Sequence, residues 1–378
     1  MAGSSGLQPS TTGRRERERY PVFDSLRIIA AVAVILAHSF PLSGHREPFV
    51  IYLGDYGLDL GAAAVATFFI ISGFLITMSW TQSPRVVPYA VRRFARIWPG
   101  FLIVVLGAAF VLGPIVTTLS VREYVTDRGT WSYVAHNAFM TPIKYRLPGV
   151  FEDLPRTAVN GSLWTLPYEV LAYVGVLLLG FVGLMQKRVV VLVMFLVALV
   201  VFRLNVASHA LHIHAKVGGM TFALLLGLSM WFLAGATLYL FKDRVPWNFP
   251  VAGVALLVTA VGGALGESLL FVGGFAYLIV FVGTRQWHAL DQVRRFGDPS
   301  YGIYLYAFPI QQTLVLAGVT GAWSLFFAAT PITVVFGYAS WHAIERPGML
   351  RMRRKTGRPA RPPVATPAPA RTLPEIAT

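Results

Sequence analysis

Long apolar runs, each bounded by charged residues, proline or glycine, follow one another along the chain from Asp24 to Trp341. A bilayer core about 30 Å thick requires about 20 apolar residues per helix, and the runs are of that length. The pattern therefore predicts an all-α, polytopic transmembrane helical bundle. Ten helices are expected, at about 24–43, 57–80, 99–119, 163–184, 188–206, 217–241, 249–265, 267–284, 300–318 and 321–345.

Basic residues fall on one side of this arrangement. Lys and Arg accumulate in the cytoplasmic loops of membrane proteins, and an inside N-terminus places most of the 32 basic residues on the inner side. Both termini are therefore expected in the cytoplasm. The short turn at Gly266 and Glu267 is the least distinct boundary, because one helix more or fewer there would move the C-terminus across the membrane.

The composition agrees with a membrane domain and excludes several other classes. Of the 378 residues, 55% are hydrophobic and 13% are charged, which leaves too little polar surface to cover a soluble globule. The net charge of +15 is spread over short loops and two tails, so no nucleic-acid partner is expected. Because the chain has no cysteine, disulfides, a thiol nucleophile and cysteine metal ligands are excluded, and no metal site is expected.

The two ends of the chain differ from its apolar body. They are rich in Ser, Gly, Pro, Ala and Arg, a composition typical of disorder. We expect a disordered basic tail at 1–20, a membrane domain at 21–347 and a disordered basic Pro/Ala-rich tail at 348–378. The first apolar run is interpreted as an uncleaved helix rather than a signal peptide, because nine further helices follow it.

Ionisable residues inside the first predicted helix are candidates for function, since a charge at membrane depth is costly unless it is paired or hydrated. Arg27 and His38 are eleven residues apart, which places them on nearly the same helix face, about 16 Å apart along the axis. A neutral imidazole can act as a general base toward a hydroxyl. The alternatives are a histidine hydrogen-bonded between helices, and an interfacial ion pair of Arg27 with Asp24.

Arginines precede the third predicted helix in the segment VRRFARIWPG. Arg93 and Arg96 are three residues apart on one helical face, with Arg92 beside them, and guanidinium groups match phosphate oxygens well. A cytoplasmic CoA phosphate would suit them. The alternative is anchoring to anionic lipid.

The fourth predicted helix carries one acid, Glu169, about two turns from its outer end in the segment NGSLWTLPYEV. Its depth is comparable with that of His38, so the carboxylate is a candidate to orient the imidazole. The alternative is a buried acid bonded to Tyr168 or Trp164. The same two aromatic residues border a long outer segment whose composition suits either stacking on sugars or the membrane interface.

Two inner segments resemble helix ends. Asp298, Ser300 and Tyr301 resemble a capped helix start, while Glu345 followed by Arg346 and Pro347 resembles a helix stop.

Taken in order, these segments resemble the acyltransferase-3 family of integral membrane O-acyltransferases. The matching stretches run from residue 21 to residue 347, and the ordered set is specific although each stretch alone is weak. They are FDSLRIIAAVAVILAHSF, FFIISGFLI, RRFARIWP, GSLWTLPYEV, and the closing GDPSYGIYLYAFP with ERP.

The resemblance implies a multi-pass enzyme of the bacterial inner membrane that moves an acyl group, most often acetyl, from cytoplasmic acyl-CoA to a hydroxyl of an extracytoplasmic carbohydrate. By position, His38 is implied as catalytic base with Glu169 close to it. Arg27, Arg93, Arg96 and Tyr301 are implied at the donor. Candidate substrate-binding residues are Asp24, Trp164 and Tyr168. Direct transfer and an acyl-histidine intermediate both remain open.

The chain departs from the family pattern at two places. Leu305, Tyr306 and Ala307 stand where the family often has Leu-Trp-His, so no second histidine is available there. Glu169 is followed by Val170 where two consecutive acids are common, which leaves Glu169 as the one carboxylate at that position.

Other classes make different predictions. A transporter or flippase would use Asp24, Arg27, His38 and Glu169 as a substrate or proton path, but many transporters are built from internal repeats and none is apparent here. A non-catalytic sensor or scaffold would tolerate loss of His38. The expected partners are the lipid bilayer, acyl-CoA and a glycan acceptor, with a homodimer as an open alternative.

Overall fold

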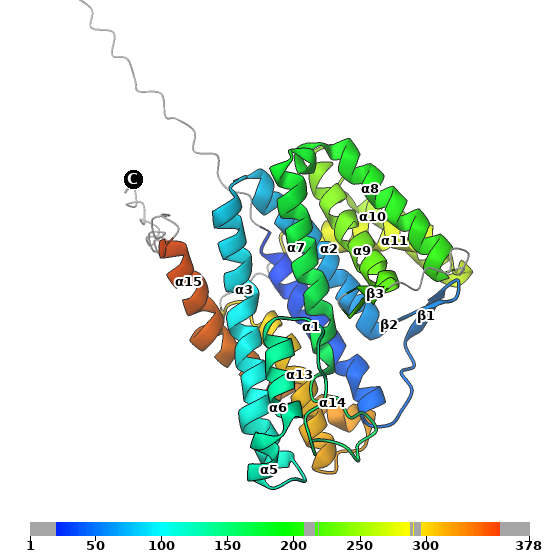
Figure 1. Cartoon of the computed structure of the whole chain (residues 1–378). Helices are drawn as coiled ribbons and strands as arrows, with labels where there is room; N and C mark the ends of the chain where they lie inside the picture. The colour runs from blue at the N-terminus through cyan, green and yellow to red at the C-terminus, as the bar shows by residue number, and fades with distance from the viewer. Residues whose placement is uncertain (1–19, 208–215, 218, 288–289, 291–295, 356–378) are drawn as a thin grey trace, which may run out of the picture.

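The computed structural model describes residues 20–207, 216–217, 219–287, 290 and 296–355, and helices dominate it (Figure 1). Within these residues, seven helical stretches are long and apolar enough to cross a membrane. They are α1 (Val22–Leu42), α2 (Leu60–Thr81), the stretch Val86–Val116 that begins with α3 (Val86–Gly107), the stretch Gly161–Phe181 that ends with α7 (Leu166–Phe181), the stretch Arg188–Asn205 that begins with α8 (Arg188–Phe202), α9 (Phe222–Leu240), and the stretch Ala322–Met352 that begins with α14 (Ala322–Ser340). The chain is an all-α, multi-pass membrane protein.

Three further helices complete the predicted set. They are α10 (Phe249–Leu265), α11 (Ser268–Thr284) and α13 (Ser300–Leu316), so each of the ten predicted ranges holds a helix in the described part of the chain. The turn between α10 and α11 is real, because Gly266 adopts a left-handed φ of +68° that ends α10.

The third helix begins earlier than predicted. The sequence placed its start at 99, but α3 begins at Val86 and contains Pro99 in its interior. The arginine segment therefore lies within the third helix rather than before it. A proline is tolerated inside a membrane helix where neighbouring helices compensate for its lost donor, and here Ile97 and Phe101 on either side of Pro99 are buried against the bundle.

The helix stop predicted at Pro347 is wrong. After α14 the chain makes a π-helical turn (Trp341–Glu345) and continues as α15 (Arg346–Lys355), so part of the segment 348–378 is helical rather than disordered. A π-helical turn changes the hydrogen-bond spacing locally, which lets the helix pass a residue without an N–H group. Helix α15 packs on α3, and the rest of the tail, like 1–19, lies outside the described residues.

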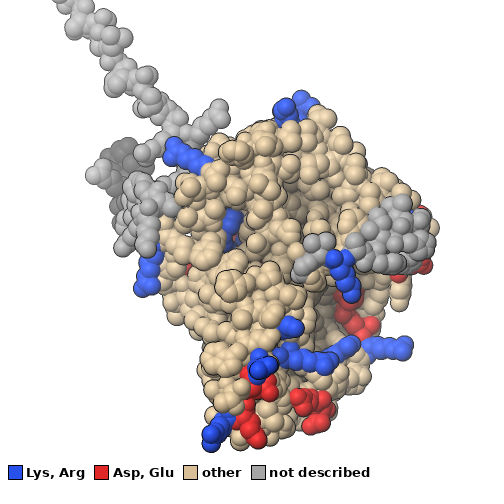
Figure 2. All heavy atoms as spheres, in the orientation of Figure 1, with Lys and Arg blue, Asp and Glu red and all other residues tan. Residues whose placement is uncertain are grey.

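The outer connections contain more structure than the apolar pattern indicates. Strands β1 (Val50–Leu53) and β2 (Tyr56–Asp59) form an antiparallel hairpin that leads into α2, so the second helix starts at 60 rather than 57. Helices α5 (Val121–Thr126) and α6 (Arg128–Ala138) lie in the segment between α4 (Gly113–Val116) and α7. In Figure 2, most of the visible surface is uncharged, and acidic and basic side chains gather at the end that carries α5 and α6.

The α2–α9 contact holds the centre of the bundle together. A Cβ atom at Gly73 would lie 1.9 Å from the carbonyl oxygen of Phe232, and one at Gly235 would lie 2.0 Å from that of Ile70. Only glycine permits this approach of two backbones, which is a common way for membrane helices to associate. Helix α2 is therefore held firmly against α9, and it also packs on α1.

Candidate active site

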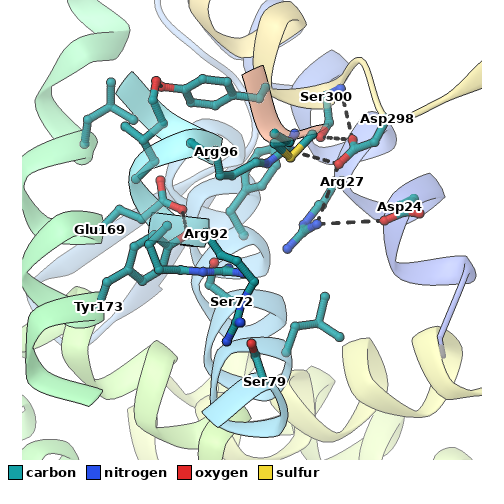
Figure 3. A pocket seen from close by; sticks show the side chains of 18 of the residues that line it. Asp24, Arg27, Ser72, Ser79, Arg92, Arg96, Glu169, Tyr173, Asp298 and Ser300 are labelled. Atoms are coloured by element: carbon teal, nitrogen blue, oxygen red, sulfur yellow. Dashed lines mark hydrogen bonds and ion pairs between the residues drawn. The ribbon is translucent and has the colours of Figure 1, made fainter. Parts of the chain in front are cut away.

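A cavity of about 540 Å³ lies among α1, α2, α3, α7 and α13, with the end of the last long helix at its margin. Its lining combines several charged and tyrosine side chains with an apolar wall from α2 (Figure 3). The polar members are Asp24, Arg27, Ser72, Ser79, Gln82, Ser83, Arg92, Arg93, Arg96, Thr165, Glu169, Tyr173, Asp298, Ser300, Tyr301 and Tyr304. Five helices far apart in sequence thus contribute to one site.

Four charged residues form what we call the inner charge cluster: Arg27, Arg96, Asp298 and Glu345. Asp298 receives Arg96 Nη2 at 2.6 Å, and Arg27 Nη1 lies 3.7 Å from the same oxygen. Arg96 Nη1 donates to Glu345 at 3.0 Å. Figure 3 shows Arg27 between Asp298 and Asp24, whose carboxylate is 3.8 Å from it. The cluster joins α1, α3, the start of α13 and the end of α14.

Asp298 is ionised at neutral pH because of these partners. Burial alone would raise its pKa, but the charges of Arg96 and Arg27, together with hydrogen bonds from Ser300, hold the pKa below the ordinary value. Ser300 donates both its backbone N–H and its hydroxyl to Asp298 Oδ1. The predicted capping role is therefore present, but the other oxygen of the same carboxylate binds arginine.

Arg96 is better placed to hold its neighbours in position than to bind an anionic ligand. Its two terminal nitrogens are both engaged by carboxylates, and its guanidinium lies 5.6 Å from the Tyr301 ring and 5.8 Å from the Trp341 ring. Tyr301 in turn donates to the carbonyl of Ile97 at 2.9 Å. Arg96 and Tyr301 therefore brace α3 against α13, although both line the cavity.

Arg93 is placed differently from Arg96. Its guanidinium lies 6.0 Å from the Tyr89 ring and 5.6 Å from the Tyr173 ring. Its Nε is buried without a hydrogen-bond partner among the described residues. It lines the cavity together with Arg92. Its charge is thus held by aromatic faces rather than neutralised by a carboxylate, which suits it to an anionic ligand.

Glu169 lines the cavity and accepts a hydrogen bond from the hydroxyl of Tyr173, one turn later in α7. The alternative partners considered from the sequence were Tyr168 and Trp164. Instead, Tyr168 accepts the N–H of Thr221 at 3.0 Å and makes an edge contact with Trp164 at 6.1 Å. Within the described ranges neither of these two lines the cavity. Of the three predicted substrate-binding residues, Asp24 alone lines it.

His38 lies apart from the cavity. Its ring meets the edge of Phe308 at 5.2 Å, and its Nδ1 is buried with no hydrogen-bond partner among the described residues. In that part of the chain it is not among the residues lining the cavity, and no hydrogen bond joins it to Glu169. The expected contact between the two is therefore wrong for this conformation.

Aromatic side chains connect the wall of the cavity to His38. Phe68 and Tyr304 both line it and meet edge to face at 5.8 Å. Phe308 follows Tyr304 by one turn on the same face of α13, and contacts His38. We refer to Phe68, Tyr304 and Phe308 as the aromatic partition.

Several of these site residues were not identified from the sequence. Asp298 and Glu345 were interpreted as helix ends, yet Glu345 is completely buried and completes the inner charge cluster. Acids bordering an apolar run could have suggested an ion pair, because buried charges require partners. Tyr173 could have been found from its i, i+4 spacing to Glu169. Phe68 begins the family-like stretch FFIISGFLI, but no polar or charged group marks it as a site residue among the apolar residues of α2.

Comparisons with known proteins find similar sequences along most of the chain. The family described as the acyltransferase domain matches residues 20–342. An O-acetyl transferase of Shigella phage Sf6 is 26% identical over 349 residues, covering 88% of this chain and 97% of the relative. Nodulation protein 10 of Rhizobium leguminosarum bv. viciae is 26% identical, covering 86% and 92%. The exopolysaccharide production protein ExoZ of Rhizobium meliloti (strain 1021) is 30% identical, covering 85% and 96%. No solved structure matches the chain.

Proposed function

Since the chain belongs to the acyltransferase domain family, we propose that it transfers an acyl group, most often acetyl, from cytoplasmic acyl-CoA to a hydroxyl of an extracytoplasmic carbohydrate. The observation that carries the proposal is a single cavity in which Arg92 and Arg93 lie near Glu169 and Tyr304. The names of two relatives, an O-acetyl transferase and an exopolysaccharide production protein, support acetyl transfer to a carbohydrate.

The donor is proposed to enter from the end that carries the inner charge cluster. CoA is polyanionic, and guanidinium groups bind phosphate oxygens in a charge-assisted geometry. Arg93 is the best placed residue, because aromatic rings hold its charge and no carboxylate occupies its buried Nε. Arg27 is the second candidate, since its two carboxylate contacts are long at 3.7 and 3.8 Å. Arg96 is proposed to keep these groups in position.

The acceptor hydroxyl is proposed to give its proton to His38. The buried Nδ1 without a protein partner supports this role, because such an atom is costly unless a ligand or water meets it. In transfer, the hydroxyl oxygen bonds to the acyl carbon while the bond from that carbon to sulfur breaks. The proton passes through the imidazole to the departing CoA thiolate, which balances the step.

The site also fits a place in the bacterial inner membrane. Arg92, Arg93 and the inner charge cluster lie at the end of the bundle that the basic loops assign to the cytoplasm, where acyl-CoA is found. His38 lies further along α1, toward the opposite end. A donor from one side and an acceptor from the other would then meet within the bundle.

The test is thiol release by the purified full-length protein in lipid nanodiscs. Acetyl-CoA and succinyl-CoA are supplied with and without candidate glycans, and acylated glycan is identified by mass spectrometry. We expect release of free CoA coupled to glycan acylation, lost in His38→Ala. Movement of substrate across vesicles without thiol release would instead support a transporter.

A further inference from the structure

Resting on the proposed function, we propose that Phe68 determines which acyl groups the protein transfers. Its side chain closes the end of the donor cavity nearest His38, so that the space available to the acyl group is short. This assigns a specificity role to a residue on α2 that carries no polar chemistry. The proposal depends on the contacts made by the aromatic partition.

Phe68 forms the cavity side of the partition. It lines the cavity and remains partly exposed to it, whereas its neighbour Phe69 is buried. Behind the ring lies a small apolar cluster between α1 and α13, which includes Ala31, Ile303 and Ala307. The Phe68 ring thus stands between open volume on one side and the α1–α13 contact on the other.

Tyr304 is the fixed member of the partition. Its hydroxyl donates to the carbonyl of Ser162 at 2.8 Å and shares a hydrogen bond of 2.7 Å with Thr165 Oγ1. These bonds hold the ring against the start of α7. Phe68 is held only by packing and by its 5.8 Å edge contact with Tyr304. Of the two rings, Tyr304 is fixed by hydrogen bonds, whereas Phe68 is held by the apolar residues that it packs against.

Tyr304, which lines the cavity, lies about one turn of α13 before Phe308, which contacts His38. Tyr304 and Phe308 are four residues apart on α13, which corresponds to about 6 Å along the axis. Phe308 contacts His38 on its far side. The Phe308 ring fills the space that a side chain at position 161 would need, because a Cβ atom on Gly161 would lie 2.5 Å from Phe308 Cε2. An acyl chain that extends from the cavity toward His38 therefore meets Phe68, and a longer chain is obstructed more than a short one.

Removing the ring should therefore lengthen the acyl site. We compare Phe68→Ala with Phe326→Ala, a matched control that packs on the same apolar cluster from α14 and does not line the cavity among the described residues. Thiol release is measured in nanodiscs with acetyl-, butyryl- and hexanoyl-CoA and a glycan acceptor. We expect the preference for acetyl over hexanoyl to fall at least about tenfold in Phe68→Ala, since one methylene in an apolar pocket changes selectivity by that order. Phe326→Ala should keep the wild-type preference.

A second readout tests the connection to His38. Without acceptor, water can attack the thioester: its oxygen bonds to the acyl carbon, the carbon–sulfur bond breaks, and CoA leaves as the thiol with one water proton. We expect this release to rise in Phe68→Ala. It should return to the wild-type rate in the double variant Phe68→Ala/His38→Ala.

The outcomes separate the two proposals. An unchanged acyl preference in a folded Phe68→Ala protein overturns the role of Phe68, even if His38→Ala abolishes transfer. Thiol release that is absent from the wild type with every acyl-CoA overturns the proposed function itself. Should Phe68→Ala not fold, as judged by size-exclusion chromatography, Phe68→Leu replaces it. An acetyl preference in Phe68→Leu equal to that of the wild type then counts against the proposal.

Discussion

Two polar regions of the bundle are built in opposite ways. In the inner charge cluster, the carboxylates meet arginines and the cavity is open beside them. Around His38 the polar atoms are few, an aromatic partition encloses them, and some lack partners in the described residues, including His38 Nδ1 and Gln311 Oε1. Burying an unpaired charge in an apolar interior is very costly, whereas burying a neutral imidazole without a hydrogen-bond partner costs much less. The first region is thus built for stability and the second for a transient contact.

The largest expected effect is on turnover at His38. In His38→Ala we expect acyl transfer to fall by about 10²–10⁴-fold, the usual contribution of a general base, with little loss of stability because Nδ1 makes no hydrogen bond. Steady-state thiol release and thermal unfolding in the same nanodiscs measure both. A contrasting variant is Gln311→Leu, which removes the bonds from Gln311 to Ile35 and Ser39 and should lower stability. If His38→Ala destabilises as much as Gln311→Leu, the contrast between the two regions is lost.

Next in size is the effect of breaking the inner charge cluster. Arg96→Ala leaves Asp298 and the buried Glu345 without their shared partner, and should reduce the free energy of unfolding by about 3–5 kcal/mol. Arg96→Lys should not restore it, because one ammonium cannot replace two guanidinium contacts. Denaturant titration measures the loss. The more exposed pair Arg203–Glu267 at 3.5 Å is the matched control, and Arg203→Ala should cost about 0–1 kcal/mol.

Arg93 should affect donor affinity rather than stability. Loss of one charge-assisted contact of about 1.5–3 kcal/mol corresponds to an increase of about 10–100-fold in the KM for acyl-CoA, with a smaller change in kcat. Arg188→Ala is the control, because Arg188 contacts Phe241 at the start of α8 and does not line the cavity in the described ranges. Equal KM values in the two variants would show that the phosphates bind elsewhere.

The smallest expected effect is on the pH dependence of stability, at the first residue of α2. Glu47 accepts the N–H of Leu60 at 2.7 Å, and burial raises its pKa from 4.5 to about 7. The folded state therefore favours the protonated acid, so its contribution to stability is complete below pH 4.5 and is lost as the pH rises through about 7. In Glu47→Gln this part of the pH dependence should disappear. Thermal unfolding between pH 4 and 8 tests it, and an unchanged profile would contradict the assignment.

The pKa of Asp298 is shifted in the opposite direction from that of Glu47, and Asp298 belongs to the inner charge cluster. Its pKa is lowered, so its contribution is present above the unfolded pKa, near 3.9, and is lost only as the pH falls below that value. The inner charge cluster should therefore stay intact over the range in which Glu47 titrates.

The apolar pattern was enough to predict every long helix, because membrane spans require long uninterrupted runs and lipid leaves few other structures available. It failed at two prolines, although it correctly continued helices through Pro41, Pro309 and Pro331. Pro99 and Pro347 both lie within helices whose neighbours and π-helical turns compensate for the missing donor. Such compensation depends on tertiary packing, which a local pattern does not contain.

The candidate site was predicted in part. Residues with charges at membrane depth, such as Arg27, Arg93 and Glu169, do line one cavity. The arrangement of Arg96 between Asp298 and Glu345 could not be predicted, since it joins three segments separated by some hundreds of residues. The predicted contact between His38 and Glu169 is not found, for another reason. Equal depth in two helices does not imply a contact, because side chains such as Tyr304 and Phe308 can stand between them.

The glycine contact between α2 and α9 bears on how quickly the protein can work. With Gly73 and Gly235 each pressed on the opposite backbone, α2 has no room to slide or turn. Helix shifts take microseconds to milliseconds, whereas a side chain that faces open volume changes rotamer in picoseconds to nanoseconds. With α2 held in place, any change in the shape of the cavity wall that it forms is left to its side chains, among them Phe68, on the faster of these timescales.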